Sequence, residues 1–168
     1  HHMPIDELLD SIKDGTDDRI FALAQLMWLG VDYNRLCNIT GIDMLFLDKI
    51  HNIVELEREI KDAPITRENL LRAKRMGFSD RHLAHLWKCS EQDVYEKRRE
   101  FGVFPVYKMI DTCASEFESY VPYFYSTYEE ENENVVSDRP KVIVLGAGPT
   151  RIGQGVEFDY STVHAVKT

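Results

Sequence analysis

Apolar residues along the first hundred positions recur at the spacing of an α-helix. The clearest example places Ile20, Leu23, Ala24, Met27 and Trp28 at the i, i+3, i+4, i+7, i+8 positions of one face. A longer stretch repeats the pattern with Phe46, Leu47, Ile50, Ile53, Val54 and Leu56. We therefore expect residues 4 to about 101 to be helical throughout, with these side chains turned toward a core.

Short polar residues stand where these helices should begin. The candidate N-caps are Thr16 or Asp17, then Asp32, Asp43, Thr66, Ser79 and Ser90. Asp93, at the third helical position after Ser90, predicts a capping box. Gly30 and Gly77 follow apolar helix faces and should end those helices, because glycine adopts the left-handed conformation of a helix end without strain.

The helical zone contains a degenerate internal duplication. Placing Gly30 on Gly77, a shift of 47 residues, aligns two rounds of helix, glycine, short capped helix and second capped helix. The matched pairs are Leu23 with Leu70, Val31 with Phe78, Asp32 with Ser79, Leu36 with Leu83, Ile39 with Leu86 and Leu47 with Val94. Two copies are too few for a solenoid, so we expect one compact bundle.

The pattern changes after residue 101. Residues 103–111 and 120–128 are rich in β-branched and aromatic side chains, which favours extended structure. An apolar run at 142–145 then leads into Gly146 and Gly148, which predicts the first strand, turn and helix of an α/β domain. A parallel sheet needs further strands, so we interpret the chain as a fragment of a larger protein.

The expected fold class is mainly α: a compact helical bundle with a degenerate internal duplication, followed by extended segments and a truncated α/β strand-loop-helix. His1 and His2, with Met3, resemble the end of an affinity tag. We expect a tag remnant at 1–3, a helical domain with its extended connections at 4–128, an acidic linker at 129–140 and a truncated α/β domain at 141–168.

Charge and cysteine content narrow the class of protein. The formal net charge of −9 is unevenly spread, since residues 66–99 hold nine Lys/Arg against five Asp/Glu, whereas residues 116–138 hold seven acids and no Lys or Arg. The three cysteines form no CxxC pair, so neither a disulfide framework nor a zinc site is indicated. Without a signal peptide or a membrane-spanning run, a cytoplasmic location is expected.

Candidate chemistry concentrates near the C-terminus. Gly146 and Gly148 begin a glycine-rich turn, but Arg151 stands where a dinucleotide fingerprint has its third glycine, and Pro149 lacks an N–H donor. Tight packing of strand on helix explains the glycines better than NAD binding. The candidate loop residues are Gly146, Gly148, Arg151, Gly153, Gln154, Glu157 and Asp159, and no catalytic or metal-binding residue is predicted.

An alternative function belongs to another class. Residues 66–99 resemble a helix-turn-helix with a basic end at Lys97, Arg98 and Arg99, which could contact nucleic-acid phosphates. The acidic chain as a whole makes a solvated helix face the better interpretation. The histidines show no metal-ligand spacing, and Cys113 is expected to be a small buried residue.

A longer run of residues resembles a known family. Gly146 to Tyr160, in the form Gly-x-Gly-Pro-x-Arg-Ile-Gly-Gln-Gly-Val-Glu-Phe-Asp-Tyr, is similar to the segment that opens the second synthetase half of the carbamoyl-phosphate synthase large subunit. Lys108 to Phe117 and Tyr125 to Glu130 resemble that family's connection out of its helical oligomerization domain. Thr16 to Glu57 resembles the start of that domain. The resemblance covers essentially all of the chain after residue 3.

The resemblance implies a parent ligase that makes carbamoyl phosphate from bicarbonate, glutamine-derived ammonia and two ATP, with Mg²⁺ or Mn²⁺, for arginine and pyrimidine biosynthesis. A glutaminase small subunit would supply the ammonia. Within that enzyme, this stretch would be the oligomerization domain, which associates with itself and connects the synthetase halves. We expect it to be inactive alone and to bind no ATP, metal ion, nucleic acid or membrane. Self-association would use apolar surface that the bundle leaves exposed, together with the aromatic residues 120–128.

Overall fold

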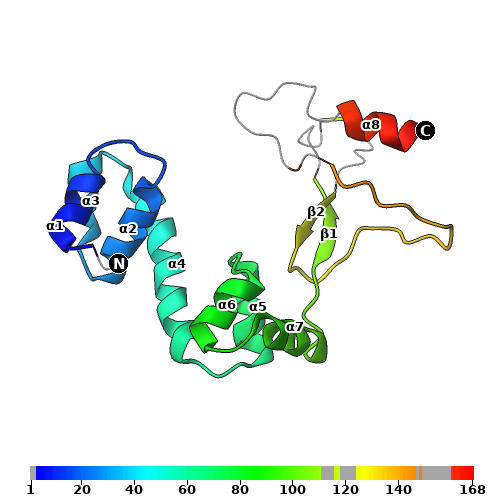
Figure 1. The fold of residues 1–168 in the computed structure, drawn as a ribbon, viewed down its shortest axis with the longest axis horizontal. Helices are drawn as coiled ribbons and strands as arrows, with labels where there is room; N and C mark the ends of the chain where they lie inside the picture. Colours follow the sequence, from blue (N-terminus) through cyan, green and yellow to red (C-terminus); the bar gives the residue numbers. More distant parts are fainter. Residues whose placement is uncertain (1–2, 111–115, 118–123, 147, 149–159) are drawn as a thin grey trace. The chain divides into compact units, whose positions relative to one another are not determined.

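A computed structural model describes residues 3–110, 116–117, 124–146, 148 and 160–168 (Figure 1). The chain divides into two compact units, residues 1–134 and 135–168. The helices of the first unit are α1 (Ile5–Ser11), α2 (Arg19–Trp28), α3 (Tyr33–Thr40), α4 (Met44–Asp62), α5 (Arg67–Arg75), α6 (Asp80–Trp87) and α7 (Glu91–Glu100). This confirms the mainly α fold class, with α1 as a helix that no individual motif predicted.

Side-chain caps begin most of these helices as predicted. Asp32, Asp43, Thr66, Ser79 and Ser90 each accept a hydrogen bond from a backbone N–H in the first turn of α3 to α7. Ser90 and Asp93 form the predicted capping box. The prediction for α2 was wrong, because that helix starts at Arg19, whose N–H donates to the Thr16 carbonyl (3.3 Å) and so needs no side-chain cap.

The internal duplication is confirmed in backbone detail. Gly30 and Gly77 have φ values of 82° and 88°, and each follows a helix whose end is closed by the same two backbone hydrogen bonds. In the first copy Val31 donates to Leu26 at 3.0 Å, and in the second Phe78 donates to Ala73 at 3.1 Å. The second left-handed position of each copy is also shared, with Gly41 at φ 66° matching Lys88 at φ 54°.

The two copies share a helix, and each has a core cluster of its own. The N-terminal core contains Leu8, Leu9, Ile12, Leu23, Leu26, Met27, Leu36, Leu47 and Val54. The C-terminal core contains Leu56, Ile60, Leu70, Ala73, Phe78, Leu83, Ala84, Leu86, Val94 and Val103. Helix α4 supplies residues to both, because its 19 residues extend about 28 Å, from one group of helices to the other (Figure 1).

An antiparallel hairpin follows the helices, as the extended segments predicted. Strand β1 (Val106–Met109) pairs with β2 (Phe124–Thr127). Part of the acidic stretch lies along the other edge of β1, where the Tyr107 N–H donates to Asn132 Oδ1 (3.0 Å) and the Glu133 N–H donates to the Tyr107 carbonyl (2.9 Å). Both edges of β1 are therefore covered, which removes an exposed pairing edge.

The second unit contains helix α8 (Tyr160–Lys167). The apolar run at 142–145 forms no strand there, and Val142, Ile143 and Leu145 are 86–92% exposed. This follows from the physical requirement of a strand for a hydrogen-bonded neighbour. Both core clusters of buried residues lie in the first unit.

Candidate functional site

The glycine-rich turn of the second unit is described at two of its predicted positions. Gly148 has φ 83°, which favours glycine. A Cβ added at Gly146 would lie 3.0 Å from the Thr162 hydroxyl oxygen of α8, so the turn and the helix approach closely. This contact favours the packing interpretation of Gly146. The other predicted loop residues, Arg151, Gly153, Gln154, Glu157 and Asp159, lie outside the described residues.

The basic end of α7 takes part in the fold. The Arg98 Nε donates to both Asp80 carboxylate oxygens (3.1 and 2.9 Å), and its Nη1 donates to the Val103 carbonyl (3.2 Å). Lys74 Nζ lies 2.9 Å from the same carboxylate. The three charged side chains are only 8–14% exposed. Arg98, which the nucleic-acid alternative would place on phosphates, is therefore used to join α5, α6 and the end of α7.

Asp80 is held ionised at the centre of this cluster. Desolvation by burial acts to raise the pKa of its carboxyl group, but hydrogen bonds from Arg98 and Lys74, with the charges of both, outweigh it and lower the pKa below its ordinary value. Asp80 is also the first residue of α6, where a negative charge is favoured by the helix dipole. The cluster is a structural joint between three helices.

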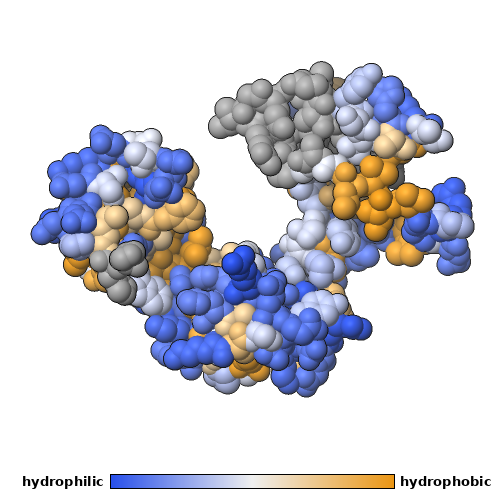
Figure 2. Space-filling model, viewed as in Figure 1, coloured by the Kyte–Doolittle hydropathy of each residue, from blue (hydrophilic) through white to orange (hydrophobic). Residues whose placement is uncertain are grey.

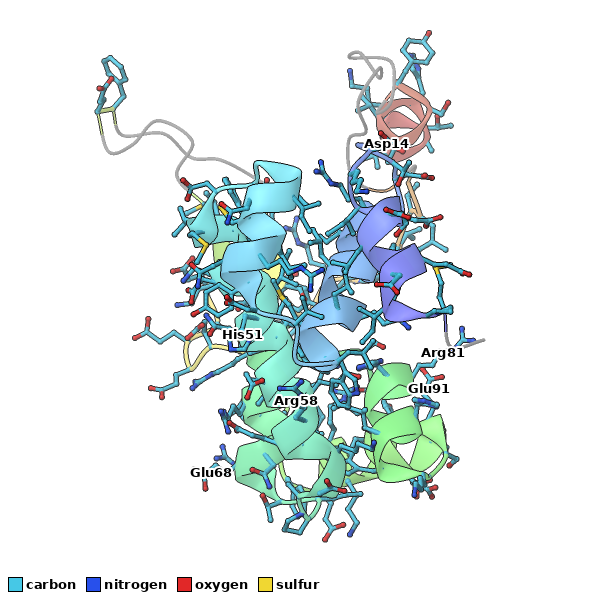
Figure 3. The ribbon with its side chains drawn as sticks, turned by 90° about the vertical axis from the view of Figure 1, so that its left-hand side faces the viewer. Asp14, His51, Arg58, Glu68, Arg81 and Glu91 are labelled. Carbon is cyan, nitrogen blue, oxygen red and sulfur yellow. The ribbon has the colours of Figure 1, made fainter. Side chains whose placement is uncertain are left out.

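At the C-terminal ends of several helices, backbone carbonyls accept hydrogen bonds from side chains that are distant in the sequence. Arg19 donates to the terminal carbonyls of α1 and α3 at 2.8 and 2.9 Å. Arg58, which lies along α4 in Figure 3, bonds the last carbonyls of α2, and the Trp87 indole N–H bonds two carbonyls at the end of α4. These contacts satisfy groups that a helix end leaves without partners. No sequence pattern predicted them, because each partner is 7 to 31 residues away.

A group of large apolar side chains remains at the surface of the N-terminal copy. Ile20 and Phe21 of α2 are 53% and 71% exposed, and Leu45, Phe46 and Ile53 of α4 are 60%, 62% and 44% exposed. The prediction that Ile20, Phe46 and Ile53 face the core was therefore wrong, since α2 and α4 turn other residues inward. Figure 2 shows apolar surface over α2 and the start of α4.

Four of these side chains, Ile20, Phe21, Leu45 and Phe46, lie in the first turn of their helices. Arg19 reaches the end of α3, just before α4 begins, while Arg58, near the C-terminal end of α4, reaches the end of α2. Helices α2 and α4 therefore start at the same end, which brings Phe21 to the level of Leu45 and Phe46. Exposed apolar groups of this kind mark interaction surfaces when they are contiguous.

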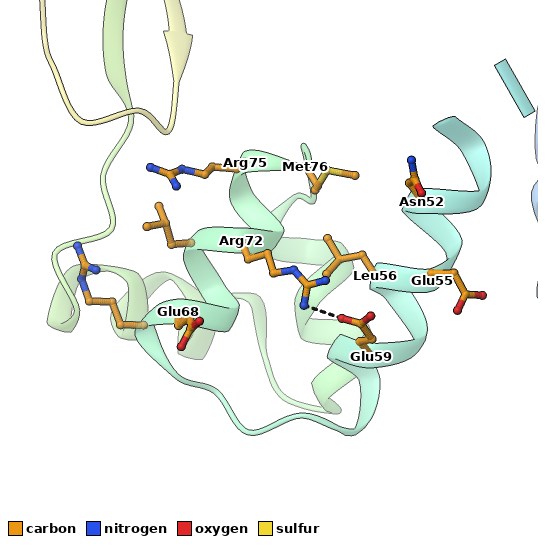
Figure 4. Close-up of a pocket in the computed structure, with 10 residues that line it drawn as sticks. Asn52, Glu55, Leu56, Glu59, Glu68, Arg72, Arg75 and Met76 are labelled. Carbon is orange, nitrogen blue, oxygen red and sulfur yellow. Dashed lines mark ion pairs between the residues drawn. The ribbon is translucent and has the colours of Figure 1, made fainter. Parts of the chain in front are cut away.

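A cavity of about 880 Å³ lies between α4 and α5 (Figure 4). Its lining includes Asn52, Leu56 and Glu59 of α4, Leu71 and Arg72 of α5, and Met76. Arg72 reaches across to form an ion pair with Glu59, whereas Met76 is 41% exposed. The cavity thus combines apolar side chains with a charged rim, which suits a protein side chain as occupant better than a free ion.

Other kinds of site find little support in the described part of the chain. There, no three His, Cys, Asp or Glu side chains are grouped to hold a metal ion, and no helix has the length and apolar character needed to cross a membrane. Cys37 and Cys89 are free thiols, and burial raises the pKa of the Cys89 thiol, which makes it a poor nucleophile at neutral pH. Cys113 lies outside the described residues.

A helical module with two cores and a group of exposed apolar side chains has the features of a domain that associates with another protein surface. Residues 1–102 match the family model for the carbamoyl-phosphate synthetase large chain, oligomerisation domain. Residues 138–168 match the carbamoyl phosphate synthase preATP-grasp domain. The chain therefore belongs to the carbamoyl-phosphate synthetase large chain family, and its helical unit is the oligomerisation domain of that large subunit. The comparisons give the nucleic-acid alternative no support.

Proposed function

We propose that the helical unit associates with a second copy of itself, and so helps to assemble a synthase whose synthetase domains it also connects. The observation that carries this proposal is the order of the two family matches along one chain, with the oligomerisation domain ahead of the preATP-grasp segment. The exposed apolar side chains of α2 and α4 support it, because self-association would remove them from water.

We assign the parent enzyme the full reaction of the family: a ligase that joins bicarbonate and glutamine-derived ammonia at the expense of two ATP, with Mg²⁺ or Mn²⁺, for arginine and pyrimidine synthesis. A glutaminase small subunit in the cytoplasm would supply the ammonia. Within the described part of this chain, acidic and histidine side chains are not grouped to hold a cation. As part of the same proposal, ATP and metal binding belong to the synthetase domains of the parent, and this chain alone is expected to be inactive.

The division of the chain follows the same proposal. Residues 4–128 would form the helical domain with its connections, 129–140 an acidic linker, and 141–168 the start of the preATP-grasp domain. The turn containing Gly146, Gly148 and Arg151 would shape the synthetase region without binding ATP phosphates. Isothermal titration of this chain with ATP tests that part, since micromolar binding would contradict it.

Self-association is tested by light scattering over a concentration series, on this chain and on a version ending at Asp138. Equal association of both versions supports the helical unit as the association module. Association of the longer version alone would assign it to the exposed apolar run at 142–145, which is a free strand-forming segment. A monomer in both cases at all concentrations would contradict the proposal for this chain.

A further inference from the structure

The stretch between the two family matches is held on the C-terminal core at two points. The chain enters β1 after Val103, whose side chain is 2% exposed within that core and whose N–H donates to the Arg98 carbonyl at 2.8 Å. It leaves β2 through Tyr128, which packs against the same core. Two described segments of this stretch are called the hairpin arm below: residues 103–110 and 124–134.

Two neighbouring residues of α5 hold Tyr128. Arg75 Nε donates to the Tyr128 carbonyl at 3.0 Å, and Lys74 Nζ lies 5.2 Å from the centre of the Tyr128 ring. An ammonium group this close to an aromatic ring is attracted by the ring electrons, and the attraction is stronger where water is excluded. The Lys74 side chain is only 8% exposed. The end of β2 is therefore held both by its backbone and by its ring.

One carboxylate connects the two ends of the arm. Asp80 accepts a hydrogen bond from Lys74, which lies over the Tyr128 ring. Asp80 also accepts from Arg98, whose Nη1 donates to the Val103 carbonyl at 3.2 Å. Since both cations share one acceptor, a change in the position of one alters the contacts of the other. The contacts thus form a continuous path from one end of the arm to the other.

The acidic stretch that follows Tyr128 holds the free edge of β1. The Tyr107 N–H donates to Asn132 Oδ1 at 3.0 Å, the Met109 N–H donates to Glu133 Oε2 at 2.6 Å, and the Glu133 N–H donates to the Tyr107 carbonyl at 2.9 Å. These backbone groups of β1 are the ones that a third strand would pair with. Because the acidic stretch begins at Tyr128, its position along β1 depends on the contacts that hold Tyr128.

We propose that the charged cluster around Asp80 is a latch that couples the C-terminal core to the hairpin arm. While the latch is closed, the arm moves as one body with α5, α6 and α7. Opening of the Asp80 contacts releases both ends of the arm together, whereas the helices keep their apolar core. A change in the packing of the second core therefore alters the mobility of the chain that leads toward the preATP-grasp match.

The test measures amide hydrogen exchange by NMR on the 168-residue chain and its variants. In the unchanged protein, the Tyr107 and Met109 amides should be protected but should exchange faster than those of α6, because the arm opens without the core. Asp80→Asn should speed exchange of these two amides by about tenfold or more, since the latch loses its charge-assisted hydrogen bonds. Arg72→Met is the matched control, because it removes an exposed ion pair with Glu59 from the same helix and should leave the arm unchanged.

A second variant opens the latch from its other end. Tyr128→Ala leaves the charged cluster in place and should speed exchange at Tyr107 and Met109 by a similar factor, with exchange in α6 unchanged. If Asp80→Asn fails to fold, this variant decides alone. The double variant should exchange no faster at these two amides than the faster single variant, because both substitutions release the same latch.

Three results would overturn the latch. The first is exchange of the Tyr107 and Met109 amides at the rate of an unfolded chain, or only together with α6, in the unchanged protein. The second is unchanged exchange of these amides in Tyr128→Ala or in a folded Asp80→Asn. The third is a double variant whose acceleration equals the product of the two single effects, because the two ends would then open independently.

Discussion

The charged cluster around Asp80 gives the sharpest stability prediction. The substitution Asp80→Ala removes an acceptor that Arg98 and Lys74 share at 2.9–3.1 Å, and leaves both cations 12% and 8% exposed with no counter-charge. Removing one member of a buried ion pair typically costs about 3–5 kcal/mol, because the remaining charge stays desolvated. That loss is a large part of the roughly 5–15 kcal/mol by which a domain is stable.

Urea unfolding followed by tryptophan fluorescence measures this loss. Trp87 is packed against the core cluster that contains α6, and Trp28 is packed against the other, so the signal covers both halves. Asp80→Asn should cost less than Asp80→Ala, because an amide oxygen still accepts hydrogen bonds. Asp10→Ala is the control, since its pair with Lys13 is 60–73% exposed and should contribute little to stability. A loss below about 1 kcal/mol for Asp80→Ala would refute the argument.

Three further predictions follow from described contacts. The pKa of the Asp80 carboxyl group is lowered in the folded protein. Its contribution to the free energy of unfolding is therefore complete above the ordinary pKa of 3.8 and is lost as the pH falls below that value. In urea titrations, the stability difference between the unchanged protein and Asp80→Asn should shrink between pH 6 and pH 3. Trp87→Phe should cost about 1–2 kcal/mol in thermal unfolding, because two carbonyls at the end of α4 lose their donor. Lys88→Gly should stabilise the protein by about 0.5–1 kcal/mol. A left-handed conformation costs a residue with a Cβ about 1–2 kcal/mol, and part of the gain is offset because glycine loses more conformational entropy on folding. Gly41→Lys, the reverse exchange in the other copy, should destabilise the protein by a similar amount. Effects of the same sign for the two substitutions would contradict the equivalence of these positions.

Features that depend on neighbouring residues could be predicted from the sequence. The caps at Asp32, Asp43 and Ser90 act within three residues, and the left-handed glycines close their own helices. The shift of 47 residues therefore revealed the duplication correctly. The two β segments were also predictable, since aromatic and β-branched residues fit a pleated backbone.

Features that depend on three-dimensional neighbours could not. Helical periodicity identifies apolar residues, but it does not distinguish a side chain facing a core from one facing solvent or a partner, and so Phe46 and Ile53 were assigned to the wrong environment. The shared use of α4 by two cores also depends on its length relative to the short helices around it. For the candidate loop, sequence and structure agree on the close approach at Gly146, and the role of Arg151 stays a prediction.

Helix α4 has a further consequence for the way the protein unfolds. It supplies Leu47 and Val54 to one core, and Leu56 and Ile60 to the other, within four helical turns. Loss of either core removes the packing that holds half of this helix. The other half then has an unsupported end, at which its backbone hydrogen bonds open more easily. Local opening on one side is therefore transmitted to the other, and the amide protons near the middle of α4 should exchange with solvent only when both halves open together.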